Sequence, residues 1–175
     1  AKLVATGSAS NIRAGIEGEA SIALSADLAA AAERLRGFLP AGQELGGSVS
    51  ASFTARESGG RTVLTGSAKV QDLRASGGGL AAPVEEKESK LDVDVAYDRV
   101  KQALDVAALD LHASFAEGHA KGRFEGLSTR PRANFQSQFH VDLRSASERF
   151  GALLPKGLAL AGMADARFQA SSDAA

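Results

Sequence analysis

The stretch DLAAAAERLRGFLPAGQELGGSVSASF, residues 27–53, returns near the end of the chain as DLRSASERFGALLPKGLALAGMADARF, residues 142–168. With the two copies aligned 115 positions apart and without a gap, 13 of the 29 residues from 27 to 55 are identical in the second copy. Composition alone would give roughly two or three matches, so we interpret the stretch as an internal repeat. Repeat proteins stack units that cannot bury their apolar faces alone.

The offset divides the 175-residue chain into three parts. Residues 1–26 are interpreted as the end of one unit, residues 27–141 as a complete repeat unit, and residues 142–175 as the start of the next unit. Because the pattern begins and ends within a unit, we expect this segment to belong to a longer array.

One short helix is predicted in each unit. Asp27 is suited to cap its first turn, and Leu28, Leu35 and Leu39 fall near one helical face. Pro40 cannot continue a helix, which gives a helix of roughly three turns. Most of the remaining sequence alternates apolar and polar residues, which is typical of strands, and the glycine-rich residues 75–90 are expected to form a long flexible connection.

The alternation contains steps of three residues, which would move the apolar side chains to the opposite face unless the strand has a bulge or a bend. These steps run from Ala9 to Ile12, Val70 to Leu73, Val106 to Leu109 and Phe124 to Leu127. We therefore predict an all-β-dominated fold with short α-helices: a curved antiparallel meander sheet that forms an open groove, with about six short strands and one short helix per 115-residue repeat.

The apolar face of such a sheet must be covered, and one short helix covers little of it. A closed sandwich or barrel is one solution, but a fixed repeat favours an open apolar groove that binds a ligand. The predicted lining residues are Val49, Phe53, Leu64, Val70, Leu91, Val93, Val95, Leu104, Val106, Leu111, Phe115, Phe124, Phe135, Phe139 and Phe168.

Composition narrows the function classes. The 20 Lys and Arg nearly cancel the 21 Asp and Glu, which argues against a nucleic-acid surface, since that needs a basic stripe. The chain has no cysteine, which excludes disulfides and thiolate chemistry. It also contains no run of 18 apolar residues, the length expected of a membrane-spanning helix.

None of the clusters of polar residues in the sequence has the pattern of a catalytic or metal site. We expect His112 and His119 to face each other across a hairpin predicted at Ala116–Glu117–Gly118, with Asp110 nearby, but a third strong metal ligand is lacking and these histidines, like His140, are interpreted as polar-face residues. The alternating aspartates are interpreted as a solvated outer face; they are Asp92, Asp94, Asp98, Asp105 and Asp110. SGGG at residues 76–79 lacks the lysine of a phosphate loop, and STRPR at residues 128–132 is interpreted as a solvated turn. No cofactor is predicted.

The order of these features resembles the repeats of AsmA-like and TamB-like envelope proteins. It comprises DL…LLP, an alternating strand, YD at residues 97–98, and L-x-V-x-x-L-x-L at residues 104–111. The resemblance implies a repeating β-groove in the periplasm of a diderm bacterium that conducts phospholipids between membranes and contributes to outer membrane biogenesis. It also implies an N-terminal membrane anchor in the parent chain.

The sequence therefore predicts a non-enzymatic groove that holds the acyl chains of phospholipids or other lipids. Inner- or outer-membrane proteins are expected as partners of the parent chain, and nucleic acid is not. Self-association through an open edge strand is also expected. Two alternatives stay open: a structural or adhesive β-repeat of a secreted surface protein with a closed core and no ligand, and a soluble carrier of a hydrophobic ligand.

Overall fold

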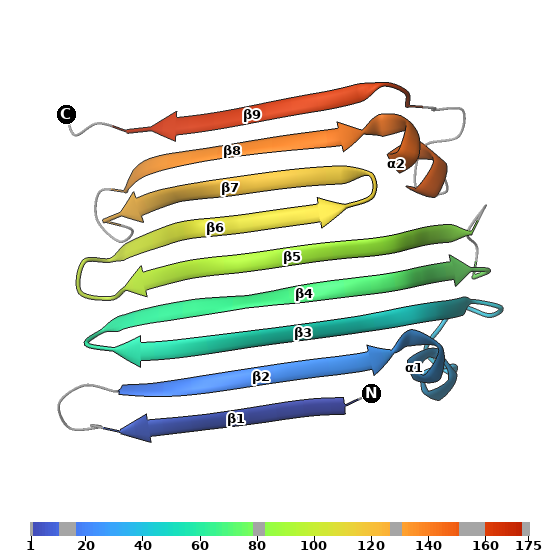
Figure 1. Cartoon of the computed structure of the whole chain (residues 1–175), viewed down its shortest axis with the longest axis horizontal. Helices are drawn as coiled ribbons and strands as arrows, with labels where there is room; N and C mark the ends of the chain where they lie inside the picture. Colours follow the sequence, from blue (N-terminus) through green and yellow to red (C-terminus); the bar gives the residue numbers. More distant parts are fainter. Residues whose placement is uncertain (1, 11–16, 79–82, 127–130, 151–159, 173–175) are drawn as a thin grey trace.

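The computed structural model is one antiparallel sheet of nine strands in sequence order, drawn in Figure 1. The structure describes residues 2–10, 17–78, 83–126, 131–150 and 160–172. Each strand pairs with the next along the chain, as expected for a meander. The first and last strands lie at opposite edges of the sheet and do not meet (Figure 1), so the predicted open sheet is confirmed and a closed sandwich or barrel is wrong for the described residues.

The described residues form nine strands and two short helices. The strands are β1 (Lys2–Ser10), β2 (Glu17–Asp27), β3 (Glu44–Ser58), β4 (Arg61–Ser76), β5 (Val84–Asp98), β6 (Ala103–Ala113), β7 (Ala116–Glu125), β8 (Arg132–Asp142) and β9 (Met163–Ser171). The helices α1 (Leu28–Arg34) and α2 (Leu143–Phe150) follow β2 and β8. Neither described helix has the length and apolarity needed to cross a membrane.

Three local expectations are corrected. The strands are longer than predicted, since β4 has 16 residues. Residues 75–90 are largely strand, because β4 extends to Ser76 and β5 begins at Val84. Helix α1 has seven residues instead of three turns and ends well before Pro40, while Asp27 does cap it by accepting a hydrogen bond from the backbone N–H of Ala30 at 2.9 Å.

The two copies of the repeat pair in the same register. Ile22 faces Phe53 across β2 and β3, and the residues 115 positions later, Ser137 and Phe168, face each other across β8 and β9. The helix caps also correspond, since Asp142 accepts hydrogen bonds from the backbone of Arg144 and Ser145, as Asp27 does from Ala30. The array beyond this segment stays a prediction.

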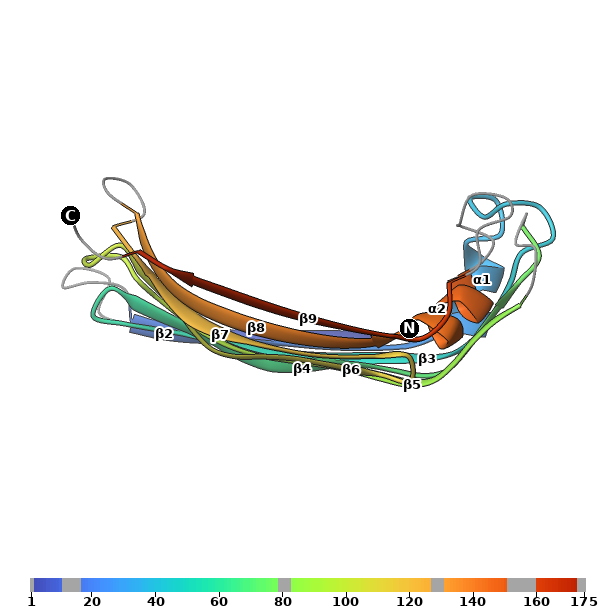
Figure 2. The same ribbon diagram turned by 90° about the horizontal axis from the view of Figure 1, so that it is seen from above.

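The strands bend so that the sheet has a concave and a convex side, as Figure 2 shows. Two of the predicted steps of three coincide with irregular pairing. The register shifts between Val106 and Leu109 in β6, and between β3 and β4 next to Asp72, whose φ is +49°. The bulge in β6 keeps Val106 and Leu109 on one face. The other two steps end at Ile12 and Leu127, which lie outside the described residues.

Glycine allows the bulge between β3 and β4. Gly47 has φ +102°, and a Cβ on it would lie 2.6 Å from the carbonyl oxygen of Asp72, so no side chain fits. Its counterpart in the second copy, Gly162, has φ +94°. Other residues rarely adopt this backbone conformation, which explains why the repeat keeps glycine at this position.

Helices α1 and α2 lie at the same end of the strands, on the concave side (Figure 2). Both follow strands that run in the same direction, so both begin where those strands end. Helix α1 contacts β3 and β2, and helix α2 contacts β5, β8 and the edge strand β9. Both helices therefore stand along the ends of the strands and leave most of the concave face uncovered.

Candidate functional site

The candidate site is the concave face of the sheet. Cross-strand pairing places the apolar side chains in three rows, two of which run across all nine strands and one from β2 to β9. The central row is Ala5, Ile22, Phe53, Gly66, Val93, Leu109, Ala120, Ser137 and Phe168. One flanking row is Gly7, Ala20, Ala55, Leu64, Val95, Val106, Gly122, Phe135 and Ala170, and the other is Leu24, Ala51, Ala68, Leu91, Leu111, Gly118, Phe139 and Ala166. Ser137 is the one polar residue in these rows.

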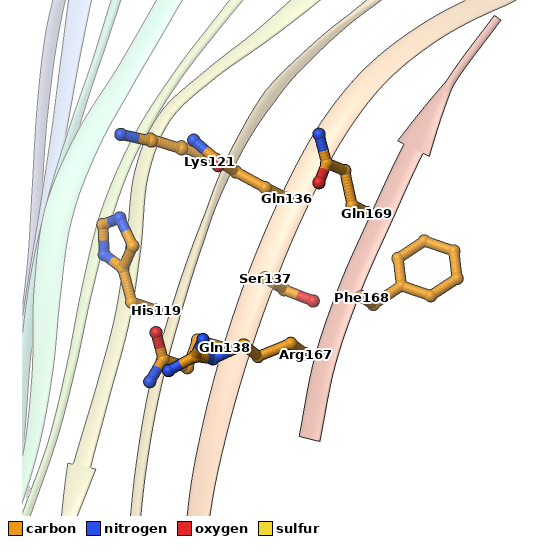
Figure 3. Close-up of a pocket in the computed structure, with 8 residues that line it drawn as sticks. All are labelled: His119, Lys121, Gln136, Ser137, Gln138, Arg167, Phe168 and Gln169. Atoms are coloured by element: carbon orange, nitrogen blue, oxygen red, sulfur yellow. The ribbon is translucent and has the colours of Figure 1, made fainter. Parts of the chain in front are cut away.

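Figure 3 shows which side of the sheet these rows occupy. The strands bend toward the side on which Phe168 lies, and Lys121 and Gln169 point to the other side. Since residues paired across strands share a face, the rows that contain Phe168 lie on the concave side. The charged neighbours of the apolar residues along each strand point to the convex side.

Most of the predicted lining residues lie on this face. Ten of them are in the three rows: Phe53, Leu64, Leu91, Val93, Val95, Val106, Leu111, Phe135, Phe139 and Phe168. Val49 and Val70 pair with each other in the next row toward the helices, and Leu104 and Phe124 pair toward the opposite ends of the strands. Their contact with a ligand stays a prediction.

Phe115 does not belong to these rows. Ala113 pairs with Ala116, so the hairpin turn is at residues 114–115 and not at the predicted residues 116–118. Phe115 is part of that turn, where its carbonyl oxygen accepts a hydrogen bond from the backbone N–H of Asp142 at 2.9 Å. The spacing of Ala113 and Phe115 resembles strand alternation, which is why the sequence analysis placed Phe115 among the lining residues.

The structure adds residues that the sequence-based list omitted. Ile22 and Leu24 of β2 and Leu109 of β6 lie in the three rows, together with several alanines. Alternation alone was sufficient to find Ile22 and Leu24. Leu109 required the bulge between it and Val106 to be placed correctly, because an unbulged strand would put these two residues on opposite faces.

The concave face is not sealed by the protein. Among the described residues the buried apolar side chains are four alanines, namely Ala96, Ala103, Ala113 and Ala120, and no large side chain is fully buried. Ile22 is 50% exposed, Leu109 38% and Phe168 60%. A contiguous exposed apolar surface of this extent is typical of an interaction site.

Phenylalanine rings lie flat on this face because they cover glycines on neighbouring strands. A Cβ on Gly118 would lie 2.6 Å from Cδ1 of Phe139, and a Cβ on Gly122 would lie 2.9 Å from Cδ2 of Phe135. A Cβ on Gly66 would similarly lie 2.5 Å from Cδ1 of Phe53. At Gly118 the ring alone occupies the space that a side chain would otherwise fill, whereas at Gly66 and Gly122 backbone atoms of the neighbouring strand are at least as close.

The convex face carries the charges, and they pair across strands. Lys69 lies 2.8 Å from Glu88, and Arg123 lies 3.2 Å from Asp105. The hydrogen bond from Lys69 holds the pKa of Glu88 below its ordinary value. A polar hollow of about 610 Å³ opens on this side, and Figure 3 shows its lining residues, among them Lys121. The face is well suited to remain in water.

The histidines are on the convex face. His112 and His119 do not face each other across the hairpin, because His112 pairs with Glu117 and His119 with Asp110. His140 lies 2.7 Å from Asp165, whose hydrogen bond raises the pKa of His140. In the part of the chain that the structure describes, no group of three or more such side chains is arranged to hold a metal ion.

The one buried charged side chain among the described residues is Glu86 of β5, which is 5% exposed. It accepts hydrogen bonds from Ser114, at 3.1 Å from the backbone N and 2.6 Å from Oγ. Glu86 pairs with Leu73, so it lies near the helix-side ends of the strands, where it ties the β6–β7 turn to β5. We therefore interpret Glu86 as a residue that stabilises the fold.

Comparison of the chain with models of known families, with curated proteins and with solved structures gave no match.

Proposed function

We propose that this segment binds lipid on its concave face, holding acyl chains against the apolar rows while polar headgroups stay in water, and that it does so without enzymatic chemistry. The observation that carries the proposal is the composition of the three rows, which run across nine strands with Ser137 as their only polar residue. Each methylene group that leaves water for such a face contributes about 0.8 kcal/mol.

The dimensions of the sheet suit this ligand. Strand β4 has 16 residues, which at about 3.3 Å per residue gives an arc on the order of 50 Å. An arc of that length, bent as in Figure 2, has room for more than one acyl chain side by side. The rows continue from strand to strand without a charged barrier, so a bound chain can slide along the face instead of stopping at one site.

The setting that we propose follows from the resemblance to AsmA-like and TamB-like repeats. The segment would act in the periplasm of a diderm bacterium as part of a longer chain that carries phospholipids between the inner and outer membranes. Its open edge strands favour continuation of the sheet by further strands, which agrees with an array of repeats and gives the groove its length.

Lipid capture tests the proposal. The purified protein is incubated with phosphatidylethanolamine vesicles, separated from them, and extracted for mass spectrometry. We expect phospholipid to be recovered with the protein. Protein that keeps its strand content, carries no lipid from its source and takes none from vesicles would refute the proposal.

A pair of variants localises the binding. Leu109→Asp puts a short charged side chain in the central row between Val93 and Ala120, at a position that is already 38% exposed. Gln136→Asp makes the same change in charge on the convex face. We expect Leu109→Asp to lose most of the bound lipid and Gln136→Asp to retain it. Equal loss in both variants would contradict binding at the concave face.

A further inference from the structure

An apolar hollow of about 430 Å³ lies on the concave face between β1, β2 and β3. Its exposed surface is almost entirely apolar, and its lining residues are Gly7, Ser8, Gly18, Glu19, Ala20, Ala55, Glu57 and Thr62. Gly7, Ala20 and Ala55 are successive members of one row, paired across the three strands. The small side chains leave the hollow open, and Ala20 itself is exposed.

The second copy of the repeat has the same place in its own sheet. Gly122, Phe135 and Ala170 stand 115 positions after Gly7, Ala20 and Ala55 and pair in the same way across β7, β8 and β9. In both copies a glycine pairs with a residue of the next strand. That residue is Ala20 in the first copy and Phe135 in the second.

The ring of Phe135 fills the place that is empty in the first copy. It lies against Gly122, since a Cβ there would be 2.9 Å from its Cδ2 atom. It also contacts two other rings, with its centroid 5.6 Å from that of Phe124 and 6.2 Å from that of Phe168. Over Gly7, in contrast, a Cβ would meet only the carbonyl oxygen of Glu19 at 3.4 Å and Ala20 at 3.7 Å.

We infer that the hollow over Gly7 is a binding subsite for a hydrocarbon segment about as large as a benzyl group, and that in a lipid ligand this segment is part of an acyl chain. In the second copy, the side chain of Phe135 occupies the position that we assign to this ligand in the first copy. The inference rests on the proposed lipid binding for the identity of the ligand. It adds that the two copies differ: β1–β3 hold an acyl segment in a recess, whereas β7–β9 present a filled aromatic surface.

Exchanging the two residues tests the subsite. Ala20→Phe installs the ring that the same register already accommodates at Phe135, and Phe135→Ala opens the corresponding hollow in the second copy. Ala23→Phe is the matched control, since Ala23 lies on the same strand but on the opposite face, paired with Ser52. Circular dichroism reports whether each variant keeps its strands.

The probe is phosphatidylcholine with a photoreactive diazirine on one acyl chain, supplied in vesicles, and the crosslinked peptides are located by mass spectrometry. We expect wild-type crosslinks in residues 17–27 and 44–58 to exceed those in β7–β9. Each methylene excluded from an apolar site weakens binding roughly fourfold, so displacing two or more should lower the crosslinks at β2 and β3 in Ala20→Phe at least about tenfold. Ala23→Phe should match wild type, and Phe135→Ala should gain crosslinks in β7–β9.

The outcomes separate the two proposals. Protein that captures no probe anywhere refutes the proposed function, and the subsite with it. Capture along the concave face that is equal in wild type and Ala20→Phe leaves lipid binding intact and overturns the subsite. Should Ala20→Phe lose its strands, Phe135→Ala decides, because an unchanged pattern of crosslinks in that variant overturns the inference as well.

Discussion

Alanine substitutions at two glycines of β7 should have very different costs, although both glycines face a phenylalanine. A Cβ on Gly118 would meet the Phe139 ring at 2.6 and 2.7 Å and the side chain of Leu111 at an ordinary 3.7 Å. A Cβ on Gly122 would lie 2.6 Å from the carbonyl oxygen of Asn134 and 2.6 Å from Cα of Phe135. The obstacle is a movable ring in the first case and the neighbouring backbone in the second.

The magnitudes follow from this difference. In Gly118→Ala the ring must retreat by about 1 Å to reach an ordinary contact distance, which costs roughly 0.5–1.5 kcal/mol in side-chain strain. Replacing a strand glycine with alanine returns roughly 0.5–1 kcal/mol of conformational entropy. The free energy of unfolding should therefore change by less than about 1 kcal/mol. Gly122→Ala must separate two strands, and overpacking of this kind costs roughly 1–3 kcal/mol.

Urea unfolding followed by circular dichroism measures both values, and a second substitution identifies the cause. Removing the ring with Phe139→Ala should make alanine at position 118 neutral or stabilising. Phe135→Ala should not rescue Gly122→Ala, because the oxygen of Asn134 and Cα of Phe135 remain. If Gly118→Ala is as costly as Gly122→Ala, or is not relieved by loss of the Phe139 ring, the account of rings lying flat over glycines is wrong.

Three further predictions concern other parts of the sheet. Glu86→Ala should lower the free energy of unfolding by about 1–3 kcal/mol in urea titrations, because it removes a charged acceptor of two hydrogen bonds from Ser114; no change would show that the turn does not depend on it. The pKa of His140, raised by Asp165, should fall in Asp165→Asn when followed by NMR, and in wild type the stabilisation from this pair is present below the unfolded-state pKa and lost as pH rises through the folded-state pKa. Sedimentation should give a mass above 17.9 kDa that falls on dilution, because β9 leaves one edge unpaired, whereas a constant monomer mass would contradict edge association.

Much of the fold could be predicted because each strand has one apolar and one polar face. Alternation in Val93 and Val95, against Asp92 and Asp94, is sufficient to identify both a strand and the face that it presents. The steps of three residues indicated curvature, and at Val106 and Leu109 the structure has the bulge that such a step requires. These signals are local, and the meander topology adds no long-range connection that could override them.

What the sequence did not reveal depends on contacts between strands. Strand length was underestimated because glycine and charged residues between 75 and 90 resemble a connection, although all of the charged ones lie in β5. Phe115 was placed on the face by alternation, whereas the pairing of Ala113 with Ala116 puts it in a turn. The hollow over Gly7 also escaped, because small residues reveal a recess only when their register with Ala20 and Ala55 is known.

The geometry explains how a sheet with so little buried core keeps its shape, which the proposed lipid binding requires. Nearly all of its order comes from backbone pairing between consecutive strands, which does not depend on filling an interior. The bend must recur at the same height in every strand, or the apolar rows would be interrupted. Gly47 lies opposite the bulge in β4, and Gly162, 115 positions later, also has a positive φ. Repeating the unit therefore lengthens the concave face without changing its cross-section, which is the property that a path for acyl chains requires.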